Sequence, residues 1–153
     1  MDTGTTIPPV SVTTPDGATL PLTSLKGQPL VVYFYPKDDT SGCTKEAQAF
    51  SALAHDFAAA GARLLGISKD SPASHAKFIA KYDLTVPLGS DTDGSVTEAF
   101  GVWVEKSMYG KKYMGIDRST FLFDADGTLV REWRKVKVPG HAEEVLAAVK
   151  GLG

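Results

Sequence analysis

YFYPKDDTSGCTKEA, residues 33–47, passes from a hydrophobic segment through a short polar loop into a segment with helical periodicity. The hydrophobic segment, Leu30–Tyr35, is rich in β-branched and aromatic residues, which predicts a central strand covered on both faces. Pro36 ends this strand, because proline has no N–H to donate to a neighbour. Apolar residues then recur at helical spacing up to Gly61, a typical residue at a helix C-terminus. The expected helix begins at or just before Cys43, which places the thiol in its first turn.

Strands and helices are predicted to alternate on both sides of this stretch. Upstream, Val10–Thr14 and a short strand near Thr19–Leu22 form a hairpin across a turn at Pro15–Ala18. Downstream, we expect a strand at Arg63–Ser68 and a helix that is opened by Ser71-Pro72 and ends near Tyr82. A short helix from about Ser95 to Phe100 and a loop through Gly115 should follow. The chain should then form an antiparallel hairpin of Ser119–Phe123 and Thr128–Trp133 and end in a helix from His141 to about Lys150. The order predicts an α/β fold with a mixed central sheet flanked by helices and an N-terminal β-hairpin.

The composition indicates one globular domain over residues 1–153, with 42% hydrophobic and 22% charged residues. A formal net charge of −2 and no basic run longer than Lys111-Lys112 argue against nucleic-acid binding. Residues 1–9 lack the pattern of a secretory signal, and no segment approaches membrane-spanning length. We therefore expect a cytoplasmic protein that does not bind membranes.

The chain has one cysteine, Cys43. A single cysteine excludes an internal disulfide, a CxxC redox pair and a zinc site built from several cysteines. Since neither a metal-ligand spacing nor a Gly-rich phosphate motif is present, we expect no metal and no cofactor. The simplest alternative for Cys43 is a buried structural thiol. Its predicted place at a helix N-terminus favours an activated one, because free backbone N–H groups there stabilise a thiolate.

Pro36-x-x-x-Thr40-x-x-Cys43 resembles the active-site signature of the peroxiredoxins. The resemblance is to the bacterioferritin comigratory protein, or Q-type, branch, and it extends from Leu30 to His141. Its further motifs are residues 66–71 (GISKDS), 87–91 (PLGSD), 105–111 (EKSMYGK) and 118–122 (RSTFL). It implies a thioredoxin-like fold and a thiol-dependent peroxidase that reduces hydrogen peroxide or alkyl hydroperoxides. Cys43 would be the peroxidatic residue, with Pro36, Thr40 and Arg118 as its companions.

Pro36 and Thr40 each have a possible catalytic role and a simpler structural one. The Thr40 hydroxyl can hold the peroxide in line with the thiolate or donate to the sulfur; alternatively, it is a turn or N-cap residue. Pro36 can shield the thiolate from water, or can serve only to end the strand.

Arg118 is expected at a core strand, where a permanent positive charge requires an anionic neighbour. The Cys43 thiolate and the oxygen that leaves the peroxide are the candidates. Glu46 is expected either to pair with Arg118 and orient it or to be a capping-box or first-turn acid that the helix dipole favours.

An estimate of the rate gained from a lower thiol pKa shows why these neighbours matter more than ionisation of the thiol. Lowering the pKa of a cysteine from about 8.5 to about 6 raises its thiolate fraction at pH 7 roughly 30-fold. A thiolate of lower pKa is also a weaker nucleophile, and this lowers its reaction rate by roughly 13-fold. Positioning of the peroxide and stabilisation of the leaving oxygen must therefore supply most of the rate.

The chain departs from many members of this branch, which carry a second, resolving cysteine. Gln48 and Ile79 stand where that cysteine is expected. The sulfenic acid must then be reduced by an external thiol, such as thioredoxin, glutaredoxin or glutathione. The resemblance favours a monomer or weak homodimer. An alternative from another class is a redox sensor or binding protein that is oxidised at Cys43 without efficient turnover.

Two other groups of residues are candidates for a site. His55, His75 and His141 are expected to be surface or capping histidines, although a Cys–His pair involving His75 or His141 stays open. Aromatic and methionine side chains between Trp103 and Met114 are expected either to pack within a loop or to line a substrate mouth.

Overall fold

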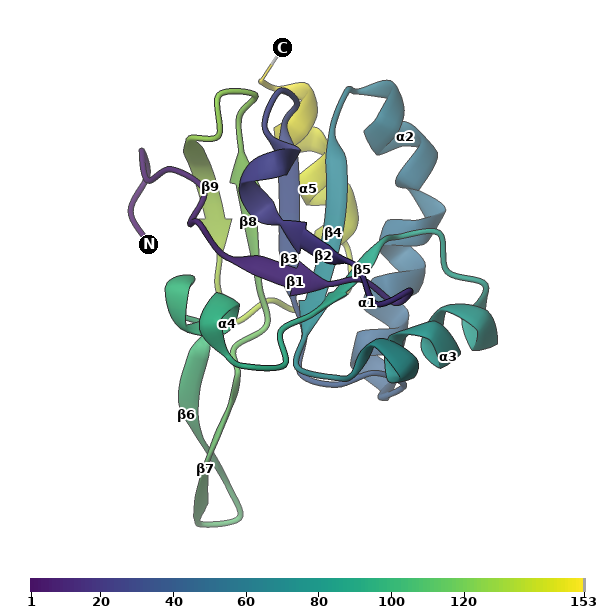
Figure 1. Cartoon of the computed structure of the whole chain (residues 1–153), viewed down its shortest axis with the longest axis vertical. Helices are drawn as coiled ribbons and strands as arrows, with labels where there is room; N and C mark the ends of the chain where they lie inside the picture. The colour runs from purple at the N-terminus through teal and green to yellow at the C-terminus, as the bar shows by residue number, and fades with distance from the viewer. Residues whose placement is uncertain (153) are drawn as a thin grey trace.

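The computed structural model describes residues 1–152 and forms a twisted sheet between two sets of packed segments (Figure 1). In chain order the elements are β1 (Ser11–Thr13), β2 (Thr19–Pro21), the 3-10 turn η1 (Leu22–Leu25), β3 (Leu30–Phe34), α1 (Ser41–Ala52), α2 (Ala54–Ala59), β4 (Arg63–Ser68), α3 (Pro72–Tyr82), β5 (Leu88–Ser90), α4 (Ser95–Ala99), β6 (Trp103–Met108), β7 (Lys111–Ile116), β8 (Ser119–Phe123), β9 (Leu129–Trp133) and α5 (His141–Lys150). The predicted α/β class, the N-terminal hairpin and the hairpin of β8 and β9 are confirmed. None of the helices in residues 1–152 is long and apolar enough to cross a membrane.

The main sheet is mixed, with strand order β2-β1-β5-β4-β3-β8-β9. β3, β4 and β5 are parallel, and the strands on both sides of them pair antiparallel. β3 lies in the interior of the sheet and is buried along its whole length, as its continuous apolar run predicts.

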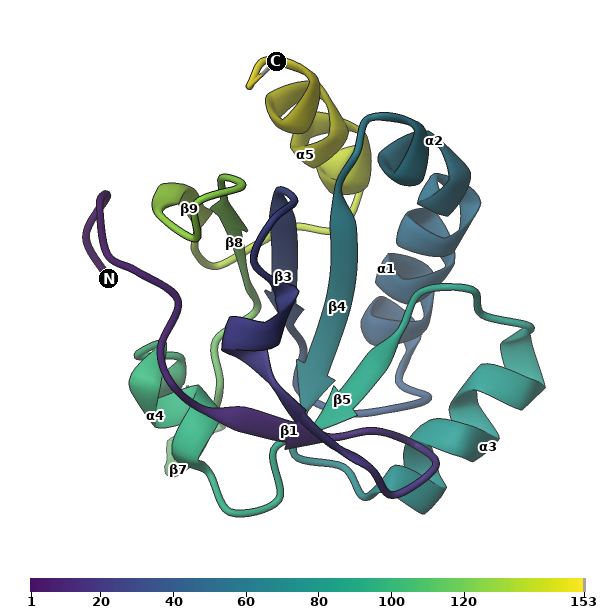
Figure 2. The same ribbon diagram turned by 45° about the horizontal axis from the view of Figure 1, so that its top comes forward.

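Each face of the sheet has its own hydrophobic core. The first core packs helices α1, α2, α3 and α5 against one face through Phe50, Phe57, Phe78 and Val145. Figure 2 shows α1, α2 and α5 together beside β3 and β4. The second core covers the other face with the N-terminal segment and α4. Alternate residues of β3 enter opposite cores, which is the period of a strand.

The pairing of β3 determines which segments meet at its carboxyl end. β8 runs antiparallel to β3 with Phe34 opposite Ser119, so the start of β8 lies beside the end of β3. β4 runs parallel to β3 with Ile67 opposite Phe34, so β4 ends at the same edge. The loop that leads into α1, the residue before β8 and the turn that leads into α3 are therefore gathered at one edge of the sheet.

Two sequence predictions are corrected by the structure. The loop expected after the short helix is instead the antiparallel hairpin β6–β7, which extends away from the rest of the chain (Figure 1). Its strands are mostly exposed and lack a buried apolar face, so periodicity could not reveal them. The single helix expected up to Gly61 is interrupted at Leu53, where α1 ends and α2 begins. At this break, Ser51 bonds to the backbone and side chain of Thr85.

Candidate active site

Cys43 lies in the first turn of α1, as predicted. Thr40 before the helix has extended backbone angles, φ −95° and ψ 157°, and its carbonyl accepts the N–H of Thr44 at 2.8 Å. The first backbone N–H groups of the helix have no partner within it, and they give this end partial positive charge. The Cys43 side chain is only 1% exposed. The sulfur therefore lies in a recess at the helix start.

Arg118 reaches this recess from the residue directly before β8. Its Nη2 donates to Cys43 Sγ at 3.3 Å, and its Nη1 donates to Glu46 Oε1 at 2.6 Å. A Cβ added at Gly42 would lie 3.2 Å from Nη2, so the guanidinium passes close over the backbone of the first turn. Although burial opposes its charge, Glu46 and Cys43 raise the pKa of Arg118 above its usual value. The Arg118 guanidinium thus binds both the Cys43 sulfur and the Glu46 carboxylate.

Glu46 is the carboxylate that holds the other side of this guanidinium. It is 1% exposed, and burial raises its pKa to about 7 against the opposing effect of Arg118. Because α1 begins at Ser41, Glu46 lies beyond the first turn, and the interpretation as an ordinary first-turn acid is wrong. The ion pair with Arg118 is present.

Pro36 and Thr40 frame the loop between β3 and α1. Both residues are exposed. Thr40 is the N-cap residue of α1 but makes no side-chain cap bond; its hydroxyl donates to the carbonyl of Lys37 at 2.9 Å. The structure thus places Thr40 and Pro36 on the segment that leads to Cys43, while the bond to the sulfur comes from Arg118.

The histidine prediction is wrong for two of the three side chains. His55 is exposed, but His75 is fully buried and His141 is 6% exposed. Each lies in the first turn of a helix that presses onto the sheet, where strand hydroxyls meet it: Ser68 and Ser90 for His75, Thr120 for His141. Burial lowers the pKa of both imidazoles. Within residues 1–152 neither forms a hydrogen bond with Cys43, so no Cys–His pair is assembled.

Lys106 of β6 is a neighbour of the site that sequence reasoning missed. Burial lowers the pKa of Lys106, and the charges of Asp117, Arg118 and Cys43 also act on it. The stem of Lys106 packs over Gly115, where an added Cβ would lie 3.2 Å from it. Lys106, which pairs with Tyr113 in the middle of the hairpin, is therefore close enough to Arg118 and Cys43 for their charges to act on it, a relationship that depends on the unpredicted strands.

The methionine and aromatic residues of the hairpin do not pack as expected of an ordinary loop. Met108, Tyr109, Tyr113 and Met114 are exposed, whereas Trp103 packs against the second core. Their interpretation as a substrate mouth stays a prediction.

Comparison with known proteins defines the class to which this fold and site belong. Residues 3–132 match the sequence model of the AhpC/TSA family. The chain is 55% identical over 124 residues to Peroxiredoxin Bcp of Xanthomonas campestris, which covers 81% of this chain and 78% of that protein. It is 43% identical over 152 residues to Peroxiredoxin Bcp of Bacillus subtilis, covering 99% and 97% of the two chains. The chain therefore belongs to the AhpC/TSA family, whose peroxiredoxins are thiol-dependent peroxidases.

Solved structures narrow the class to one branch. The bacterioferritin comigratory protein of Xanthomonas campestris, studied for its alkyl peroxide reduction activity, superposes with a TM-score of 0.89 at 48% identity, covering 94% of this chain and 91% of that one. A cysteine-to-serine mutant of Xylella fastidiosa PrxQ gives a TM-score of 0.94 at 42% identity, covering 99% and 97%. The thioredoxin-like fold is confirmed, and the chain is a thiol-dependent peroxidase of this Q-type branch with a single cysteine.

Proposed function

We propose that this peroxidase reduces hydrogen peroxide and alkyl hydroperoxides at Cys43. The observation that carries the proposal is the position of Arg118, which donates to Cys43 Sγ at 3.3 Å while Glu46 holds its other nitrogen at 2.6 Å. The alkyl peroxide reduction activity of the related Xanthomonas protein supports the substrate class. Sulfur itself carries the two electrons, so the reaction requires no cofactor.

In the first step the Cys43 thiolate attacks one peroxide oxygen. The S–O bond forms as the O–O bond breaks, sulfur loses two electrons, and the leaving oxygen takes a proton to become water or an alcohol. Arg118 stabilises first the thiolate and then the charge that develops on the leaving oxygen. Glu46 orients Arg118, the Thr40 hydroxyl holds the peroxide in line, and Pro36 limits water at the recess.

In the second step an external thiol restores the enzyme. Because Cys43 is the only cysteine, its sulfenic acid condenses with that thiol to a mixed disulfide and water. A second thiol then releases the Cys43 thiolate. Thioredoxin, glutaredoxin and glutathione are the proposed reductants.

The direct test follows peroxide consumption with each reductant supplied in turn. We expect sustained turnover with at least one reductant and loss of all turnover in Cys43→Ser. A Cys43→Ser variant as active as the native protein would overturn the site assignment.

Burial of Cys43 favours one second candidate function, a redox sensor oxidised once without efficient recycling. At 1% exposure the sulfur presents almost no surface to a protein thiol unless the start of α1 moves. Oxidation of Cys43 by peroxide with no turnover under any reductant would identify this function.

We further propose that the chain is one domain, acts in the cytoplasm and is a monomer or weak homodimer. Light scattering across a concentration series tests the last point, and a stable higher oligomer would contradict it.

A further inference from the structure

A cavity of about 310 Å³ lies between the end of β9 and the start of α5. Its size is that of a small-molecule site, for which volumes of about 300–1,000 Å³ are usual. It is lined mostly by the segment of residues 133–141 that connects the two elements. Val136, in the middle of this segment, donates its N–H to the carbonyl of Arg118 at 2.9 Å. The cavity is therefore beside the residue whose guanidinium binds Cys43.

The cavity is positively charged although the whole chain is not. Arg134, Lys135 and Lys137 line it together with one carboxylate, that of Glu144, whereas the chain has a formal net charge of −2. Arg134 is already paired with Asp117 at 3.7 Å. Lys135 and Lys137 are exposed, and neither forms an ion pair within residues 1–152. These two ammonium groups are free to pair with an anion in the cavity.

Two ring nitrogens without partners belong to the same lining. His141 is 6% exposed, and its Nε2 shares a hydrogen bond of 2.7 Å with Thr120, while its Nδ1 has no partner among residues 1–152. Trp133 stands edge-on to the His141 ring, with centroids 5.7 Å apart, and over the same residues its buried Nε1 is unpaired. Since buried polar groups normally have a hydrogen-bond partner, both nitrogens favour a ligand with acceptor oxygens.

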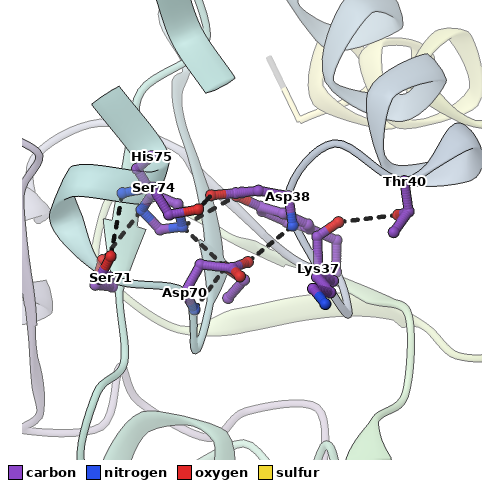
Figure 3. A network of polar contacts seen from close by, with 10 residues as sticks. Lys37, Asp38, Thr40, Asp70, Ser71, Ser74 and His75 are labelled. Atoms are coloured by element: carbon purple, nitrogen blue, oxygen red, sulfur yellow. Dashed lines mark hydrogen bonds and ion pairs between the residues drawn. The ribbon is translucent and has the colours of Figure 1, made fainter. Parts of the chain in front are cut away.

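His75 shows the opposite arrangement (Figure 3). Its Nε2 is bonded to Ser68 at 2.8 Å and its Nδ1 to Ser90 at 3.1 Å. Two neighbouring aspartates lie close enough to share a metal ion with it, but both nitrogens are already engaged. That cluster needs no ligand, and the unused hydrogen-bonding capacity of a buried histidine is at His141.

The state of His141 suits a carboxylate. Burial lowers the pKa of His141; Glu144 opposes this shift and the charge of Arg118 adds to it, so the imidazole is neutral at neutral pH and has one N–H. When Thr120 donates to Nε2, this N–H is on Nδ1 and can donate to a carboxylate that the two lysines hold. Gly140, the N-cap of α5, has no side chain to occupy the first N–H groups of the helix, which add partial positive charge.

We propose that this cavity binds the carboxylate of a small acidic thiol, the class to which glutathione belongs, and so brings that thiol to the Cys43 sulfenic acid. The inference rests on the proposed function, in which a single cysteine requires a thiol from outside. Cys43 is 1% exposed, which favours a small thiol over the broad surface of a protein.

The reaction of the bound thiol follows the proposed second step. Its sulfur attacks Cys43 Sγ, the S–O bond of the sulfenic acid breaks, an S–S bond forms, and the hydroxyl leaves as water with the proton of the thiol. A second molecule of the same thiol then attacks the mixed disulfide. This step releases the Cys43 thiolate and a disulfide of two small thiols.

The test compares glutathione with its diethyl ester, which keeps the thiol and has no free carboxylate. Cys43 is oxidised with one equivalent of hydrogen peroxide, and stopped-flow then follows reaction of the sulfenic acid with each thiol over a range of concentrations. The native rate should saturate with glutathione and rise linearly with the ester. In Lys135→Gln/Lys137→Gln the apparent Kd for glutathione should rise about tenfold, the effect of losing two exposed ion pairs. The limiting rate, the ester reaction and oxidation by hydrogen peroxide should stay within about twofold of native.

His141→Gln tests the buried donor separately. Glutamine can keep a bond to Thr120 but has no counterpart of the Nδ1–H. Loss of one hydrogen bond to a charged group should raise the apparent Kd for glutathione about tenfold and leave the ester reaction unchanged. Equal effects on the two thiols would contradict this role.

Lys111→Gln/Lys112→Gln is the matched control, because it removes the same charge from the exposed hairpin β6–β7. It should leave the apparent Kd for glutathione unchanged. The inference is overturned if Lys135→Gln/Lys137→Gln binds glutathione like the native protein, if both double variants weaken glutathione equally, or if Lys135→Gln/Lys137→Gln instead slows oxidation by a hydroperoxide that carries a carboxylate. Failure of every thiol, dithiothreitol included, to reduce the native sulfenic acid would overturn the proposed function, and the inference with it.

Discussion

Arg118 Nη2 donates to Cys43 Sγ at 3.3 Å across 75 positions of the chain. The antiparallel register of β3 and β8 creates this contact, because it places Ser119 opposite Phe34. The cation is thus carried by the rigid centre of the sheet, while the thiol is carried by a helix start. Stabilisation of developing charge depends on such fixed geometry, since a preorganised donor needs no rearrangement during the reaction.

Arg118→Ala should slow oxidation of Cys43 by hydrogen peroxide about 100- to 1,000-fold, the usual cost of removing one preorganised donor. The oxidation rate of Arg118→Lys should lie between those of the native protein and Arg118→Ala, because a single ammonium cannot replace a guanidinium that binds two partners. Stopped-flow rates at several pH values separate this effect from a change in thiolate fraction. Arg131→Ala is the control, since Arg131 is exposed and lies over the Trp133 ring. An unchanged rate at matched thiolate fraction would leave Arg118 a structural role only.

Glu46 makes stability fall as pH rises. Burial raises the pKa of Glu46 to about 7 from its ordinary value of 4.5, so between these values the folded state binds more protons than the unfolded state. This contribution is fully present below the unfolded pKa and is lost as pH rises through the folded one. Glu46→Gln removes this pH-dependent contribution. From pH 4 to pH 8 the free energy of unfolding of the variant should therefore rise by about 2–3 kcal/mol relative to that of the native protein. Urea denaturation across this range measures the difference, and parallel profiles would contradict the expectation.

The sequence could predict the local part of the site because local signals define it. Pro36 and the helical period place Cys43 at a helix start, and the apolar run identifies β3. The charge of Arg118 indicates that it needs an anionic partner. No local signal, however, fixes the register of β3 and β8, on which its distance to Cys43 depends.

The features that the sequence did not predict also depend on tertiary contacts. His75 has the helical context of a surface residue, and its burial follows from Ser68 and Ser90 on neighbouring strands. The exposed strands of β6–β7 lack the apolar alternation that identifies a half-buried strand. The sequence therefore places Lys106 in a loop and gives no sign that its side chain lies near Cys43.

Gly66→Ala should destabilise the sheet beneath the site. An added Cβ would lie 2.6 Å from Tyr33 Cζ, and the Tyr33 ring is itself stacked on Phe50 with centroids 4.6 Å apart. Because the ring has little room to move, we expect the free energy of unfolding to fall by about 1–3 kcal/mol. Gly151→Ala is the control, since its nearest contact would be 3.4 Å. Equal denaturation midpoints for the two variants would show that Tyr33 can shift freely.

Thr40→Val tests whether the hydroxyl acts on the peroxide or only shapes the turn. The hydroxyl donates to the Lys37 carbonyl at 2.9 Å, which leaves its lone pairs free to accept a peroxide O–H. Valine keeps the branched shape and removes this acceptor. We expect oxidation of Cys43 by hydrogen peroxide to slow about 10- to 100-fold, the cost of a misplaced substrate. Thr40→Ser should keep most of the rate.

The same two variants also separate the turn role by stability. α1 receives no side-chain cap bond from Thr40, so Thr40→Val should lose only the bond to Lys37, about 1 kcal/mol. Thermal denaturation measures this loss beside the stopped-flow rate. A slower oxidation with a small loss of stability means that the hydroxyl holds the substrate. Native oxidation with the same loss of stability would limit Thr40 to the turn, and alignment of the peroxide would then fall to Arg118.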